Sequence, residues 1–104
     1  MSTPSTMAVV DCVRAIPPGR VASYGSIAAM SGNPSGASGA RQVARILHSM
    51  SRTHNLPWWR VVKKDGSIAL SEEGGLDLQR QLLEEEGVAF MEGGRVDMEE
   101  FGFY

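Results

Sequence analysis

The chain has 104 residues, of which 42% are hydrophobic and 21% charged, and its formal net charge is −2. This length favours one domain with a modest core, and because no apolar run of about 18 residues occurs, a membrane span is excluded. The single cysteine, Cys12, excludes an internal disulfide framework and favours a reducing compartment, so we expect a cytoplasmic protein. The first twelve residues lack the basic and apolar regions of a secretory signal.

The charge is distributed unevenly along the chain. Residues 1–64 carry eight Lys or Arg and one acid, which gives 8 − 1 = +7, whereas residues 65–104 carry two Arg and eleven acids, which gives 2 − 11 = −9. Such an asymmetry is typical of a protein with an anionic partner on one side, although solvated faces of an ordinary protein would give the same pattern.

Three helices are predicted in the first half of the chain. In "TMAVVDCVRAI" the inner residues lie near helical spacing, and Ser5 or Thr6 would cap the helix. "VASYGSIAAMSG" predicts a second helix with Ser23 as its cap and Gly32 as its end. "ARQVARILHSM" predicts a third. The expected core residues of these helices are Val9, Val10, Val13, Ile16, Ile27, Ala28, Met30, Val43, Ile46, Leu47 and Met50.

The small-residue turn "NPSGASG" joins the second and third helices, so the pair is typical of a helix-turn-helix. The segment "WWRVV", the turn signal Asp65-Gly66 and "SIAL" then predict a β-hairpin, which would be the wing of a winged helix. "GLDLQRQLLEEEGV" predicts a last helix with Leu78, Leu82 and Leu83 inside and Gly87 at its end. The acidic tail is expected to be loose or to form one short strand over residues 94–97.

The candidate chemical groups are few. One cysteine and two distant histidines, His48 and His54, give no metal-ligand spacing, and no cofactor is expected. Cys12 has no histidine beside it in sequence and reads as a small apolar residue. Trp58 and Trp59 would point to opposite sides of a strand, so we expect one of them to be available as a stacking surface for a base; the alternative is that both pack against helices.

Several short motifs together resemble one family. "VASYGSIAAMSGNP", "ARQVA", "LPWWRVVKKDGSIAL" and "LDLQRQLLEEEGV" follow the order found in the DNA-binding domain of the O6-alkylguanine-DNA alkyltransferases, over roughly residues 7–90. That family moves an alkyl group to the cysteine of a Pro-Cys-His-Arg-Val motif, which here reads Pro57-Trp58-Trp59-Arg60-Val61. The chain therefore resembles the alkyltransferase-like proteins, in which tryptophan replaces the cysteine. The histidine that usually follows is Trp59 here.

The resemblance implies a mainly α winged helix-turn-helix domain spanning residues 1–104, with an acidic C-terminal tail. It implies a monomer that binds duplex DNA in the minor groove, flips O6-alkylguanine into a pocket and leaves the alkyl group in place, since an indole is no substitute for a thiolate. Nucleotide excision repair proteins would be further partners. Arg41 would fill the gap left by the base, Tyr24 would push on the phosphate, and Trp58 would contact the base. The other implied site residues are Gly39, Ala40, Ala44 and Arg45 in the groove, and Arg60, Val61, Val62 and Ser71 around the pocket.

Three other functions stay open on the residues alone. A winged-helix transcription regulator would read sequence with polar side chains on the third helix, for which Gln42 and Arg45 are candidates. An enzyme would use Cys12 as an unusual acceptor. A protein-interaction domain would have lost DNA binding altogether.

Overall fold

The computed structural model describes residues 4–32, 37–68 and 75–104. Its elements, in chain order, are α1 (Pro4–Arg14), β1 (Ala22–Ser23), α2 (Tyr24–Met30), α3 (Ala37–His54), the single 3₁₀ turn η1 (Trp58–Arg60), β2 (Val61–Val62), α4 (Gly75–Glu85), β3 (Phe90–Met91), β4 (Arg95–Val96) and α5 (Met98–Phe101). The mainly helical architecture with little sheet is the one that the sequence predicts.

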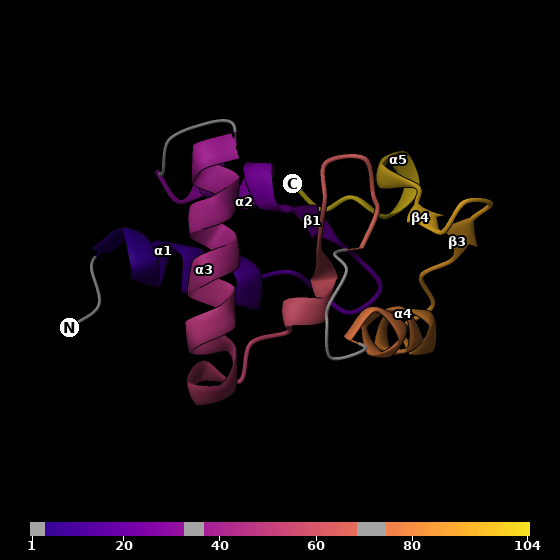
Figure 1. Cartoon of the computed structure of the whole chain (residues 1–104), viewed down its shortest axis with the longest axis horizontal. Coiled ribbons are helices and arrows are strands. Elements are labelled where there is room, and N and C mark those ends of the chain that lie inside the picture. The colour runs from indigo at the N-terminus through magenta and orange to yellow at the C-terminus, as the bar shows by residue number, and fades with distance from the viewer. Residues whose placement is uncertain (1–3, 33–36, 69–74) are drawn as a thin grey trace.

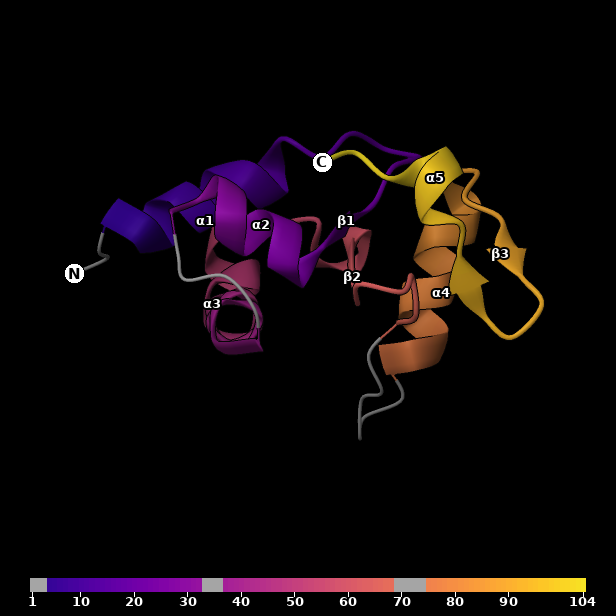
Figure 2. The same ribbon diagram turned by 90° about the horizontal axis from the view of Figure 1, so that it is seen from above.

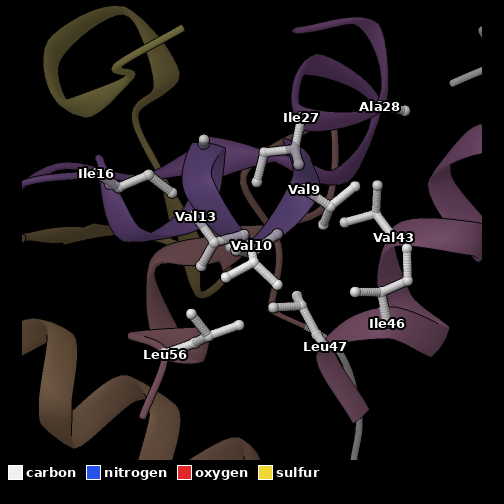
Figure 3. Close-up of a cluster of buried hydrophobic side chains, with 12 residues drawn as sticks. Val9, Val10, Val13, Ile16, Ile27, Ala28, Val43, Ile46, Leu47 and Leu56 are labelled. Atoms are coloured by element: carbon white, nitrogen blue, oxygen red, sulfur yellow. The ribbon is translucent and has the colours of Figure 1, made fainter. Parts of the chain in front are cut away.

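The first half of the chain is a three-helix unit in which α3 runs across α1 (Figure 1). Valines and isoleucines at three- and four-residue steps bury one face of each helix against the others (Figure 3). Val9, Val10 and Val13 of α1 and Val43 of α3 are fully buried. Met30 was expected to be inner but is 60% exposed, because it lies two positions after buried Ala28 and so on the other side of α2.

A second cluster of buried residues lies under the C-terminal elements. It contains Val21, Val62, Ile68, Leu83, Val88 and Val96, with Trp59, Phe90, Met98 and Phe101 packed against it. The tail is therefore part of the fold: the amide of Val21 donates to the carbonyl of Phe101 at 2.9 Å, and the amide of Phe103 donates to the carbonyl of Val21 at 2.8 Å. The short strand that the sequence allowed near residues 94–97 is β4.

β2 has a pairing that the sequence did not predict. It pairs in parallel with β1, with Ala22 opposite Val61 and Ser23 opposite Val62, and among the described residues β3 and β4 form an antiparallel hairpin. The second arm of the predicted wing reaches residues 69 and 70, which lie outside the described residues. Asp65-Gly66 does form a tight turn, in which the amide of Lys63 donates to the carbonyl of Ser67 at 2.9 Å. β2 is buried, so it pairs inside the protein, and α2 and α3 supply the long connection that a parallel pair needs.

Two helices differ from their predicted limits or faces. α3 begins at Ala37, three residues before the predicted start. In α4 the inward positions are Gln79 and Leu83, while Leu78, which was expected to be inner, is 49% exposed. Gly87 ends α4 as predicted, with a φ of +93° that favours glycine.

Candidate nucleic-acid interface

The start of α2 carries Tyr24. Ser23 caps this helix as predicted, because its hydroxyl accepts from the amide of Ser26 at 3.1 Å. Tyr24 is half-buried against the buried residues of the three-helix unit, which we call the first cluster. This burial raises the pKa of its phenol. The ring is therefore held by packing on the first turn of the helix, and its hydroxyl stays protonated at neutral pH.

A stripe of basic residues follows the outer face of α3. Arg41, Arg45, His48 and Arg52 are all exposed, and their steps of four, three and four residues place them on one helical face. The buried residues of α3 lie on the opposite face, so the stripe points away from the core. We call these four residues the α3 stripe. In Figure 2, α3 lies below α1 and α2, and the C-terminus lies above them.

The small residues of α3 divide between its two faces. Ala44 is exposed beside the α3 stripe, and Ala40 is half-buried. Gly39, which the sequence placed in the groove, is buried instead. The reason is its spacing, because it precedes the buried Val43 by four residues and shares that inward face. Gly39 therefore belongs to the buried face of α3.

The two tryptophans lie in η1 rather than in a strand, but they still point to different sides. Trp58 packs against the first cluster and Trp59 against the second. Their rings meet edge to face, with centroids 6.0 Å apart and planes at 87°. Both remain partly exposed. The predicted alternation thus has the right outcome, but a 3₁₀ turn and not a pleat produces it.

Arg60 and Glu86 form an ion pair behind the tryptophans. The guanidinium of Arg60 donates to Glu86 through Nε at 3.0 Å and Nη2 at 2.5 Å, and to the carbonyl of Ile16 through Nη1 at 2.8 Å. The indole Nε1 of Trp59 donates to the same carboxylate at 3.1 Å. Burial alone would raise the pKa of Glu86, but the hydrogen bonds from Arg60 and Trp59 outweigh it, and the pKa is lowered. Glu86 therefore stays ionised and fixes both residues after Trp58.

Gln79 completes this support from α4. Its side chain is 3% exposed, and its Nε2 donates to the carbonyls of Trp59 at 3.1 Å and Val61 at 3.0 Å. Neither Gln79 nor Glu86 was predicted, because Gln79 stands beside Arg80 and Glu86 ends a run of three glutamates, so each has the neighbours of an outer position. The sequence did offer a signal for Gln79, because it precedes Leu83 by four residues and therefore lies on the same face of the helix.

Of the remaining predicted pocket residues, the structure describes Val61 and Val62 but not Ser71. Val61 and Val62 are fully buried in β2, so their side chains serve the core and any contact with a base would come from their backbone. Ser71 lies outside the described residues. The structure thus brings Trp58, Arg60 and β2 together, and the parallel register sets them beside Ser23 and Tyr24.

Cys12 lies apart from this arrangement, on α1. Burial raises the pKa of its thiol, with a smaller contribution from Asp11, against the lowering effect of Tyr104. The Tyr104 hydroxyl donates to the carbonyl of Cys12 at 2.9 Å. A thiol with a raised pKa is a poor nucleophile, so the residue serves as a structural one.

Two features of the described ranges bear on other functions. Within residues 4–32, 37–68 and 75–104, no three His, Cys, Asp or Glu side chains gather as metal ligands would. No helix in the same ranges is long and apolar enough to cross a membrane.

Comparisons with known proteins agree on one family. Residues 4–88 match the model of the 6-O-methylguanine DNA methyltransferase DNA-binding domain. The "DNA base-flipping protein" of Escherichia coli (strain K12) is 41% identical over 95 residues, which cover 89% of this chain and 69% of the relative. "Alkyltransferase-like protein 1" of Schizosaccharomyces pombe is 42% identical over 81 residues, which cover 77% of this chain and 72% of that protein.

Solved structures give the same grouping. The S. pombe Atl1 protein, in complex with damaged DNA containing O6-carboxymethylguanine, superposes with a TM-score of 0.81 at 32% identity, covering 100% of this chain and 99% of that one. The O6-methylguanine methyltransferase of Mycobacterium tuberculosis superposes with a TM-score of 0.62 at 31% identity, covering 83% of this chain and 50% of that one.

Proposed function

The chain belongs to the 6-O-methylguanine DNA methyltransferase DNA-binding domain family, and we propose that it is a non-enzymatic sensor of DNA damage. It binds duplex DNA through the minor groove, rotates an O6-alkylguanine out of the helix and holds it in a pocket beside Trp58. The alkyl group stays on the base. The standing complex then marks the lesion for nucleotide excision repair.

The observation that carries this proposal is the position and setting of Trp58. By the resemblance of Pro57-Trp58-Trp59-Arg60-Val61 to the Pro-Cys-His-Arg-Val motif, Trp58 would stand where the family has its transferring cysteine, and an indole cannot accept an alkyl group as a thiolate does. Its ring is packed on one side and partly exposed on the other, which suits a stacking wall for a flipped base, worth about 1–3 kcal/mol. The relatives named for base flipping and for binding damaged DNA support the same function.

A proton acceptor is also missing at the neighbouring position. A thiol at position 58 would need a base beside it, but Trp59 offers only an N–H donor, and Glu86 already accepts from Trp59 and Arg60. Catalysis by this pocket is therefore disfavoured twice, by the acceptor residue and by its neighbour. Reversible binding is the function that both residues permit.

The α3 stripe and Tyr24 supply the DNA contacts in this proposal. Arg41 lies in the first part of α3 and is exposed, so its guanidinium can enter the gap that the base leaves. Arg45, Ala44 and Ala40 follow along the groove. Tyr24 presses on the phosphate that must turn. Flipping costs a few kcal/mol, and less for a base that pairs badly, which favours alkylated guanine over guanine.

The test is a binding titration with two duplexes that differ by one O6-methylguanine. We expect the wild type to bind the lesion duplex more tightly. Arg41→Ala should abolish this preference, whereas Arg52→Ala removes one exposed arginine from the far end of the same stripe and should weaken both duplexes alike. The mass of the protein should be unchanged after incubation with the lesion duplex.

Equal binding of the two duplexes by the wild type would contradict the proposal. A preference for particular undamaged sequences would favour a transcription regulator instead, and an alkylated Cys12 would favour an enzyme. Equal losses of lesion preference in Arg41→Ala and Arg52→Ala would remove the special role of Arg41.

A further inference from the structure

The turn between β2 and Ile68 presents the two lysines of the chain, Lys63 and Lys64, side by side and exposed. Its backbone is closed by two hydrogen bonds, from the amide of Lys63 to the carbonyl of Ser67 at 2.9 Å and from the amide of Gly66 to the carbonyl of Lys63 at 2.8 Å. Neither lysine has a carboxylate within 4.0 Å among the residues that the structure describes. The hydrogen-bonded turn therefore holds the backbone of two positively charged residues in one conformation.

Asp65, the acid nearest to these lysines in sequence, is engaged inside the turn. Its Oδ1 accepts from the amide of Ser67 at 3.0 Å and from the hydroxyl of Ser67 at 2.6 Å. These hydrogen bonds lower the pKa of Asp65. The carboxylate of Asp65 therefore shapes the turn. Within the described part of the chain, neither ammonium group has an ion-pair partner, so both can meet an external anion.

The C-terminal hairpin braces the same turn. The amide of Val96 in β4 donates to the carbonyl of Gly66 at 2.9 Å, and Ser67 forms an antiparallel bridge with Arg95. Gly66 is buried, has a φ of +88°, and leaves no room for a Cβ against the backbone of Val96. The brace comes from the acidic part of the chain, which thereby positions a basic element.

The parallel register of β1 and β2 sets this turn beside the start of α2. Ser23 is opposite Val62, and both strands run in the same direction, so Tyr24 and Lys63 leave the pair at the same end. Tyr24 is the residue that the proposed function places on a phosphate. The register therefore places the two lysines at the end of the strand pair where Tyr24 begins α2.

From these observations we propose that Lys63 and Lys64 form a second phosphate-binding site, beside Tyr24, for the backbone of the strand that carries the flipped nucleotide. The site binds phosphodiesters without reading sequence or damage. It anchors the strand on one side of the rotating nucleotide, while the α3 stripe holds the groove. The β3–β4 hairpin keeps the two lysines in place. This inference rests on the proposed function for its ligand.

The test is the salt dependence of binding for the double variant K63A/K64A, measured on both the lesion duplex and the plain duplex. Each lost phosphate contact should reduce the slope of log K against log salt by about 0.9. The advantage of the wild type should therefore shrink roughly tenfold between 50 and 200 mM salt. The ratio of lesion to plain affinity should stay constant, because the site does not sense the base.

Controls separate a contact from general charge. K63R/K64R should keep the slope of the wild type, and Arg80→Ala, which removes a cation from α4, should also leave it unchanged. An unchanged slope in K63A/K64A would overturn the proposal. The slope on the plain duplex decides this point even if the wild type shows no lesion preference, an outcome that would overturn only the proposed function.

The brace has its own test. Gly66→Ala keeps both lysines but forces the turn away from Val96. At a temperature where circular dichroism shows a folded protein, we expect this variant to lose affinity for both duplexes and to show a smaller salt slope. Wild-type affinity and slope in a folded Gly66→Ala would overturn the positioning role of the hairpin.

Discussion

Removing the carboxylate of Glu86 should lower the free energy of unfolding far more than removing the carboxylate of Glu84 on α4. The side chains of Arg60 and Glu86 are 12% and 15% exposed, and Glu86→Ala would leave Arg60 with the carbonyl of Ile16 alone and Trp59 without its acceptor. Breaking a buried pair on one side costs about 3–5 kcal/mol, and the partial exposure places this case near 3 kcal/mol. The free energy of unfolding, measured by urea denaturation with far-ultraviolet circular dichroism, tests this value.

Glu84→Ala is the matched control, because it makes the same change two positions earlier. Glu84 pairs with Arg80 at 3.6 Å, and both side chains are about half exposed, so its loss should cost about 0.3–0.5 kcal/mol. Circular dichroism is preferred to fluorescence because both tryptophans lie at the perturbed site. Equal losses in the two variants would refute the view that Glu86 supports the pocket wall.

Three further predictions follow from the same contacts. The pKa of Glu86 is lowered in the folded protein, so its ionised carboxylate should contribute fully to stability above its ordinary pKa of about 4.5. This contribution should be lost as the pH falls through the lower, folded pKa. Glu86→Gln should remove this pH dependence from the free energy of urea unfolding. Ser23→Ala should cost about 1 kcal/mol through the lost cap of α2, in the same assay, and a cost near zero would contradict the capping role. Leu83→Ala should cost about 2–5 kcal/mol, whereas Leu78→Ala should cost much less; similar losses would contradict the observed face of α4.

Local patterns were enough to predict much of the helical unit. Valines and isoleucines at helical steps determine which faces of α1 and α3 are buried, and the cap at Ser23 is a local choice of hydrogen bond. The family motif carried the resemblance, because it is contiguous in sequence. The burial of Gly39 could not be predicted for the same local reason, because its small size is visible in the sequence but the face it occupies depends on where α3 begins.

Long-range pairings could not be predicted in this way. The parallel pairing of β2 with β1 joins residues about 40 positions apart, and two residues of each strand carry no register signal of their own. Glu86 lies 26 positions from Arg60 and is the last of three consecutive glutamates. The sequence does not indicate which of the three meets Arg60, because that depends on where α4 ends. The lysine turn was visible as a turn, but its brace from β4 depends on the folded tail.

The most direct test of the central claim is whether binding flips the base and then releases it unchanged. A duplex with O6-methylguanine next to the fluorescent base 2-aminopurine reports unstacking at the lesion. We predict that the protein raises the fluorescence, that high salt returns it to the starting value, and that the recovered DNA still contains O6-methylguanine. A constant fluorescence on saturated binding, or recovery of plain guanine, would contradict the claim that this protein is a reversible base-flipping sensor.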